Sequence, residues 1–140
     1  MHCVAYKDGY KYQLAQDYVV DTGIAPPAPV NEKFYAMDPH GRLTIRHGYA
    51  WDGPSGPTFD THNFMRGSLV HDALYQLMRE GQLTPVDNYR EATDRLLQTI
   101  CKEDGMTALR AWWVYKGVRF GGSNSTTNGK PLLHSPKGCP

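Results

Sequence analysis

The chain has 140 residues, a formal net charge of +1, 40% hydrophobic residues and 21% charged residues. That length suits a single domain with one hydrophobic core, and the composition is that of an ordinary globular protein. Acidic and basic residues are interspersed without a basic stripe, which argues against nucleic acid as a partner.

Cysteine spacing and hydropathy exclude further classes. The cysteines, Cys3, Cys101 and Cys139, lie far apart and form no CxxC pair, which argues against a zinc ribbon or a disulfide-rich scaffold. No apolar run reaches the roughly 18 residues of a membrane span, and the first residues lack the pattern of a secretory signal. We therefore expect synthesis in a cytoplasm, with any exit by lysis, packaging or a dedicated export route.

The N-terminal part of the chain predicts strands and turns. Residues 33–37 and 42–47 flank a turn of sequence Asp-Pro-His-Gly, so we expect them to pair as a β-hairpin. A further strand-rich stretch covers residues 10–20. Residues 49–57 hold two glycines and two prolines, which predicts an irregular loop with exposed carbonyl groups.

The remainder predicts helices. The first spans about residues 63–80 and ends at Gly81, a position typical of a C-terminal cap. The second begins with Thr84 as its N-cap and Pro85 at the first helical position. Because the connection is short, we expect these two helices to pack side by side in opposite directions.

A third helix covers about residues 107–120, and its broad apolar face predicts packing on two sides. Trp112 and Trp113 are expected in the core, although an exposed aromatic patch there could touch a lipid surface. The chain then becomes rich in Gly, Ser, Asn, Thr and Pro. We therefore expect one domain at residues 1–121 and a polar C-terminal tail at residues 122–140.

An adjacent His71–Asp72 pair lies inside the apolar pattern of the first helix, where an unpaired imidazole or carboxylate is costly. Consecutive helix residues point about 100° apart, so these two side chains should diverge and need other partners. Tyr75 lies on the same helical face as His71, and the geometry allows Asp94 on the second helix to meet His71 across the helix pair. Asp72 should then point toward the irregular loop.

This pattern suits hydrolytic chemistry. A carboxylate on one imidazole nitrogen leaves the other free to take a proton from water, so His71 is a candidate base oriented by Asp94 and Tyr75. A second carboxylate with loop carbonyls would form an oxygen-rich cage suited to calcium, which stabilises the oxyanion formed by water attack. The candidate metal ligands are Asp72, Asp52, Trp51, Gly53 and Ser55.

Other interpretations stay open. Asp52 and Asp72, with His71, also suit a different metal centre, such as one that holds zinc or manganese. Asp52 could instead simply begin a turn. The histidine, tyrosine and aspartates could also form a purely structural polar network. Arg119 is interpreted as a solvated charge.

The sequence His71-Asp72-x-x-Tyr75, followed by Asp94 on the next helix, resembles the core of phospholipase A2, and more closely its disulfide-free form in parvovirus capsid proteins. The resemblance implies that His71 is the general base and that Asp72 binds calcium. It also implies that Tyr75 and Asp94 form the network behind the histidine. In that family a Gly-rich loop before the helix supplies carbonyl ligands.

A wider set of motifs covers about residues 10–121. An Asp-Gly-x-Ser-x-Pro loop at residues 52–57 precedes the His-Asp-x-x-Tyr helix, and Arg-x-Ala-x-Asp follows at residues 90–94. A last aromatic helix closes in Val-Arg-x-Gly at residues 118–121. This order is similar to that of a family of small tailed-phage proteins of unassigned function.

These features predict an α+β domain with an N-terminal β-hairpin or small antiparallel sheet, a phospholipase A2-like antiparallel helix pair and a third aromatic helix. The expected function is a phage-encoded, calcium-dependent hydrolase that acts on phospholipid esters of the host envelope and is made in the host bacterial cytoplasm. One alternative is a non-catalytic virion or tail-associated structural protein that docks on other virion proteins through its C-terminal tail. Another is a metal-dependent cell-wall amidase or peptidase, with zinc in place of calcium.

Overall fold

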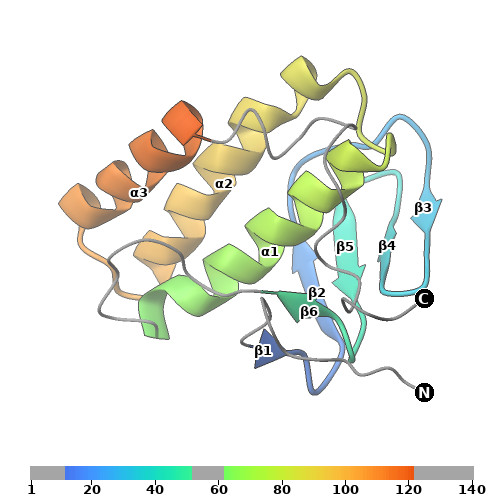
Figure 1. Cartoon of the computed structure of the whole chain (residues 1–140), viewed down its shortest axis with the longest axis horizontal. Helices are drawn as coiled ribbons and strands as arrows, with labels where there is room; N and C mark the ends of the chain where they lie inside the picture. Colours follow the sequence, from blue (N-terminus) through green and yellow to red (C-terminus); the bar gives the residue numbers. More distant parts are fainter. Residues whose placement is uncertain (1–11, 52–61, 122–140) are drawn as a thin grey trace.

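The structure, a computed structural model, describes residues 12–51 and 62–121. Six short strands are followed by three α-helices and one 3-10 turn, η1, so the expected α+β class is confirmed (Figure 1). The strands are β1 (Tyr12–Gln13), β2 (Tyr18–Asp21), β3 (Val30–Asn31), β4 (Tyr35–Met37), β5 (Arg42–Ile45) and β6 (Ala50–Trp51). The helices are α1 (His62–Arg79), η1 (Val86–Asn88), α2 (Arg90–Glu103) and α3 (Ala108–Gly121).

The expected hairpin is present as β4 and β5, which pair antiparallel with Met37 opposite Leu43. The side chain of Asp38 holds the turn, because its Oδ1 accepts the backbone N–H groups of His40 and Arg42. Strands β2 and β3 extend this hairpin into a four-stranded antiparallel sheet of order β2-β5-β4-β3. Strands β1 and β6 form a separate two-stranded pair.

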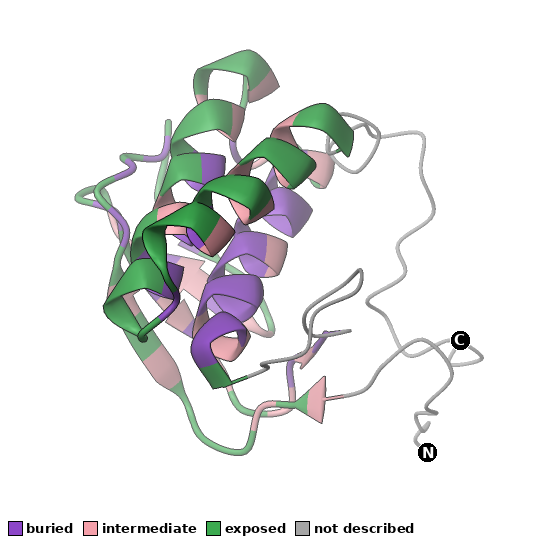
Figure 2. Cartoon of the chain, turned by 90° about the vertical axis from the view of Figure 1, so that its left-hand side faces the viewer, coloured by how far each residue is buried: buried purple, intermediate pink, exposed green. Residues whose placement is uncertain are grey.

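Helix α1 forms the centre of the described structure. It lies between the strands on one side and α2 on the other, and Figure 2 shows buried residues concentrated along it. Its apolar side chains share one hydrophobic cluster with the inward residues of the sheet, including Leu43 and Ile45 of β5. The positive φ of Gly81, 79°, follows the end of α1, as expected for a C-terminal cap.

The three helices pack in sequence, α1 against α2 and α2 against α3, and each runs opposite to the one before it (Figure 1). Gly67 of α1 permits close approach to α2, because a Cβ added there would lie 2.9 Å from Leu97 Cδ1 and 3.0 Å from Cys101 Sγ. A second hydrophobic cluster fills the space among the helices and includes Ala111 of α3 and the buried thiol of Cys101. The expected antiparallel helix pair is therefore confirmed.

The second helix begins later than the sequence predicted. Pro85 has an extended conformation with ψ 144°, so it does not occupy the first helical position and Thr84 is not an N-cap. One 3-10 turn follows, and the regular helix starts at Arg90. Tyr89 serves as the N-cap through its backbone, and its carbonyl accepts the backbone N–H and the hydroxyl of Thr93.

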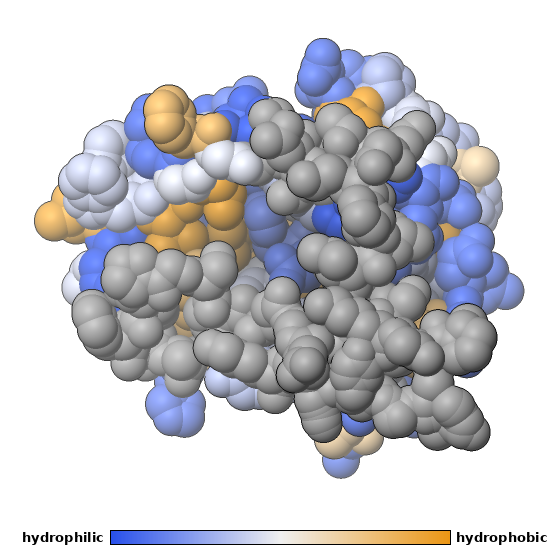
Figure 3. Space-filling view, viewed as in Figure 1, coloured by the Kyte–Doolittle hydropathy of each residue, from blue (hydrophilic) through white to orange (hydrophobic). Residues whose placement is uncertain are grey.

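The prediction that Trp112 and Trp113 lie in the core is wrong. Among the described residues, helix α3 packs on the side that faces α2, and the two indoles are 44% and 62% exposed. Figure 2 faces α3 and shows exposed residues on its outward turns, and Figure 3 shows hydrophobic surface at the same end of the molecule. Within the described ranges, none of the helices has the length and hydropathy needed to cross a bilayer.

Candidate functional site

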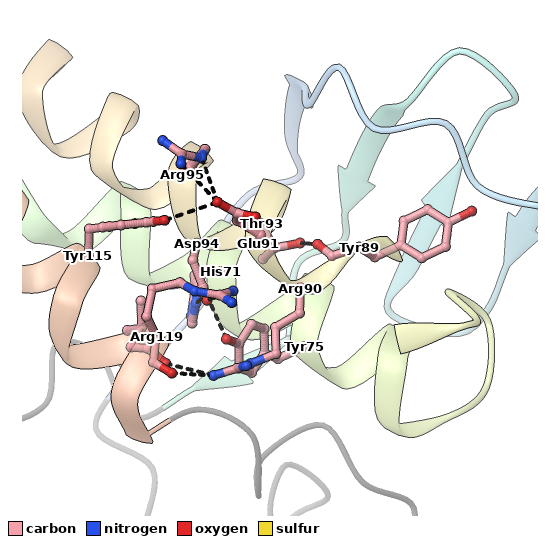
Figure 4. Close-up of polar contacts among 11 residues, drawn as sticks. His71, Tyr75, Tyr89, Arg90, Glu91, Thr93, Asp94, Arg95, Tyr115 and Arg119 are labelled. Atoms are coloured by element: carbon pink, nitrogen blue, oxygen red, sulfur yellow. Dashed lines mark hydrogen bonds and ion pairs between the residues drawn. The ribbon is translucent and has the colours of Figure 1, made fainter. Parts of the chain in front are cut away.

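Three side chains meet where α1 crosses α2. His71 and Tyr75 lie one turn apart on α1 with ring centroids 4.1 Å apart, and both face the second helix. His71 Nε2 lies 2.7 Å from Asp94 Oδ1, and the Tyr75 hydroxyl donates to the same oxygen at 2.5 Å (Figure 4). The expected meeting of Asp94 with His71 and Tyr75 is therefore confirmed as geometry.

Arg119 completes this cluster from α3, and the interpretation of it as a solvated charge is wrong. Its Nη1 donates to Asp94 Oδ2 at 3.0 Å, so the two carboxylate oxygens have donors from two different helices (Figure 4). Arg90 of α2 holds the end of α3 in place, because its Nη2 donates to the Arg119 carbonyl at 2.5 Å. Reasoning from local pattern missed both arginines, although both belong to motifs that the sequence analysis singled out at residues 90–94 and 118–121.

The electrostatics favour a charged pair in the buried site. Burial lowers the pKa of His71, but the carboxylates of Asp72 and Asp94 raise it by more, and the net shift is upward. Burial raises the pKa of Asp94, but its three donors lower it by more, and the net shift is downward. The fully buried Asp94 therefore stays ionised, and the imidazolium persists to higher pH than in free histidine.

Tyr75 is a neutral donor to Asp94. Burial raises the pKa of its phenol, and the hydrogen bond to the Asp94 carboxylate raises it further, while Arg90 nearby has the opposite effect. The hydroxyl proton therefore stays on Tyr75 at any physiological pH. The His71 ring and the Tyr75 hydroxyl share one oxygen of the Asp94 carboxylate, and this shared contact fixes the orientation of the imidazole plane.

The side chains of His71 and Asp72 were expected to point apart, but in the structure they remain within ion-pair range of each other. The separation of His71 Nδ1 and Asp72 Oδ1 is 3.8 Å, which is too long for a hydrogen bond but within ion-pair range. The imidazole thus has Asp94 on one nitrogen and the Asp72 carboxylate near the other. The Asp72 side chain is 31% exposed, whereas that of His71 is 8% exposed, so Asp72 lies on the solvent side of the pair.

The predicted metal ligands are only partly described. Asp52, Gly53 and Ser55 lie outside the described residues. Trp51 is buried in the core cluster, where its indole N–H donates to the Ser68 hydroxyl at 3.1 Å and its ring stacks on Tyr49. Among residues 12–51 and 62–121, no group of three His, Cys, Asp or Glu side chains is arranged to hold a metal ion.

The described residues therefore define an α+β protein with a buried, oriented histidine on a helix pair. Residues 29–118 match the family described as "Protein of unknown function (DUF1353)", and because the match covers more than half of the chain, the chain belongs to this family. Neither the curated proteins nor the solved structures yield a match. Family membership thus supports the wider motif likeness in part, and says nothing of phage origin or phospholipase activity.

Proposed function

We propose that this protein is a hydrolase of phospholipase A2 type in which His71 is the general base and the substrate is a phospholipid ester of the host envelope of a phage. One observation carries the proposal. His71 Nε2 is held at 2.7 Å by the buried Asp94 carboxylate, which leaves Nδ1 toward the partly exposed side of α1. A histidine oriented in this way is the arrangement that general-base hydrolysis requires.

Each described residue has a definite task in this proposal. At a pH above the raised pKa of His71, Nδ1 carries no proton and would accept one from the attacking water, and Asp94 would stabilise the imidazolium that results. Tyr75 and Arg119 would keep the Asp94 carboxylate in place and ionised throughout. The network therefore supplies orientation and charge, while the protonation change is confined to one imidazole nitrogen.

Among the predicted ligands, Asp72 is the described carboxylate that suits a calcium ion, because it is partly exposed and adjoins Nδ1 of His71. One carboxylate does not make a site, so the other ligands would come from the predicted set at residues 51–55. When bound, calcium supplies Lewis-acid stabilisation of the negative charge that develops on the ester oxygen. This oxygen-rich set suits calcium better than zinc, which prefers nitrogen and sulfur ligands.

The test measures fatty acid release from vesicles of phosphatidylethanolamine and phosphatidylglycerol, with calcium or with a chelator. The wild-type protein should release fatty acid only with calcium, and His71→Gln should lower the rate by about 100-fold or more. Asp72→Asn should raise the calcium concentration needed for half-maximal rate. His47→Gln is the matched control. His47 is an exposed imidazole that follows strand β5 and pairs with Asp17.

Circular dichroism and the urea midpoint of each variant must show that the fold is kept. Absence of fatty acid release by folded wild-type protein would refute the proposal. Equal rates for His71→Gln and wild type would also refute it, because the base would then lie elsewhere.

A structural role is the second candidate, and one observation favours it. Asp94 accepts hydrogen bonds from α1 through His71 and Tyr75 and from α3 through Arg119, so its carboxylate joins three helices without a catalytic step. In that case the protein would act by binding, as a virion or tail-associated component. Its presence in purified virions in fixed stoichiometry, without lipid hydrolysis, is the expected result.

A further inference from the structure

Helix α3 carries apolar side chains on two opposite sides. The inner side packs against α2 through Ala111, with Val114 and Val118 partly buried beside it. The outer side repeats at i, i+3, i+4, i+7 and i+11, which places its members along one helical face. We name this set the outer stripe; it comprises Leu109, Trp112, Trp113, Lys116 and Phe120.

The apolar members of the outer stripe lie open to solvent. Leu109 is 66% exposed, Trp113 is 62% exposed and Phe120 is 94% exposed, while Trp112 is 44% exposed. They account for four of the five large hydrophobic residues that are exposed in the described part of the chain, the fifth being Val19 on the sheet. Concentration of such residues on one helical face marks an interaction surface rather than scattered surface apolarity.

The charge of α3 identifies the kind of surface that it fits. The helix contains Arg110, Lys116 and Arg119 and no acidic residue. Arg119 is used by Asp94, so Arg110 and Lys116 are the cations available outside the helix packing. Lys116 Nζ lies 5.6 Å from the centroid of the Trp112 ring, so a cation and an indole share the middle of the stripe.

We infer that the outer stripe docks α3 on an anionic phospholipid surface. Indole, phenyl and leucyl groups enter the interface between headgroups and acyl chains, while lysine and arginine side chains reach the lipid phosphates. A second copy of the chain is a poorer occupant, since two stripes would bring cations together without an acidic partner on α3. The inference deepens the proposed function and rests on it in part, because that function makes phospholipid the substrate.

The position of α3 connects this surface to the site. Arg119, on the flank of α3 between the inner side and the stripe, donates to Asp94 at 3.0 Å, and Arg90 holds the carbonyl groups of the last turn of α3. The helix that would bind the lipid surface through its outer stripe is therefore also the helix that completes the charged cluster through Arg119. A single helix thus contributes both the exposed stripe and a donor to the buried cluster.

The test uses vesicles of diether phosphatidylglycerol, which have no ester to hydrolyse, so that binding is measured apart from turnover. The wild-type protein should co-sediment with these vesicles, and less with diether phosphatidylcholine or at high salt. Trp113→Ser and Phe120→Ser should each weaken binding by about tenfold, and Lys116→Gln by about fivefold. Val19→Ser is the matched control, because Val19 is an exposed apolar residue on strand β2 and not on α3. This variant should bind the vesicles as wild type does.

The outcomes separate the two proposals. Absence of vesicle binding by folded wild-type protein would overturn the inference even if the protein hydrolyses a soluble ester. Equal binding by Phe120→Ser and wild type would overturn it as well. A stable dimer in sedimentation equilibrium that Trp113→Ser abolishes, without lipid binding, would assign the stripe to self-association instead. Binding without hydrolysis of ester vesicles would uphold the inference and refute the proposed function.

Discussion

Replacing Asp94 by alanine removes the acceptor for three donors in a site where the carboxylate is fully buried. His71, Tyr75 and Arg119 would each lose a hydrogen bond, and the His71–Asp94 ion pair would lose one charge. Breaking a buried ion pair by removing one partner costs about 3–5 kcal/mol. Since a domain is stable by about 5–15 kcal/mol, the variant should lose a large part of its free energy of unfolding.

The assay is urea unfolding of Asp94→Ala, Asp94→Asn and wild type, followed by circular dichroism. With a slope of about 1–3 kcal/mol per molar urea, a loss of about 3–5 kcal/mol should lower the midpoint of Asp94→Ala by roughly 1–5 M. Asp94→Asn keeps the shape and one acceptor oxygen, so it should lose less. Asp87→Ala, a change at an exposed carboxylate before α2, should leave the midpoint close to that of wild type.

The pH dependence gives a second readout with a definite sign. The pKa of Asp94 is lowered on folding by its three donors, against the effect of burial, so its contribution to stability is present above its ordinary value near 3.8. That contribution is lost as the pH falls through the lowered value in the folded protein. The difference in stability between wild type and Asp94→Asn should therefore shrink as the pH falls from about 5 to 2.

A loss of less than about 1 kcal/mol for Asp94→Ala at pH 6 would refute this reasoning. It would mean that the three donors find water or other partners when the carboxylate is absent. A difference between wild type and Asp94→Asn that stays constant down to pH 2 would show that folding does not lower the pKa of Asp94.

Two further predictions concern the contact between α1 and α2. Gly67→Ala should cost up to about 2 kcal/mol in urea unfolding, because crowding of Leu97 and Cys101 by the new Cβ offsets the roughly 1 kcal/mol that alanine gains over glycine in a helix. Relief in a Gly67→Ala, Leu97→Ala double variant would locate the strain there. Gly117→Ala, at a helical position with open space, should be neutral or stabilising, and a loss as large as that of Gly67→Ala would contradict the packing argument. Burial, with the nearby Asp104 charge, raises the pKa of the Cys101 thiol to about 12. In a chain whose other cysteines are serine, this thiol should therefore react with a disulfide reagent at pH 8 only after unfolding, and rapid labelling of the native protein would show that it is accessible.

Local sequence rules predicted the elements that depend on nearby residues. The β4–β5 hairpin follows from a turn whose Asp38 side chain bonds to backbone groups two and four positions away. The end of α1 follows from Gly81, which adopts the positive φ that other residues avoid. The start of α2 was predicted too early, because Pro85 suits either a first helical position or an extended one, and its neighbours decide between them.

The cluster of His71, Tyr75 and Asp94 could be predicted from the sequence because helix geometry is regular. Spacing placed Tyr75 on the face of His71, and a short connection brought α2 against α1, so Asp94 was found as their partner. Arg119 was missed because it lies 25 positions from Asp94 and reaches it only through the packing of α3 on α2. No local pattern distinguishes an arginine that enters a buried site from one that remains in water.

The sequence by itself determined the α+β fold class, the approximate positions of the main helices and the pairing of His71 with Asp94. Each of these follows from periodicity, turn residues or the high cost of an unpaired buried charge. Only the tertiary structure decided which side of α3 is covered and where the second oxygen of Asp94 finds its donor. Periodicity shows that a helical face is apolar, but which neighbour covers it depends on how the whole chain packs, and that left the outer stripe of α3 exposed.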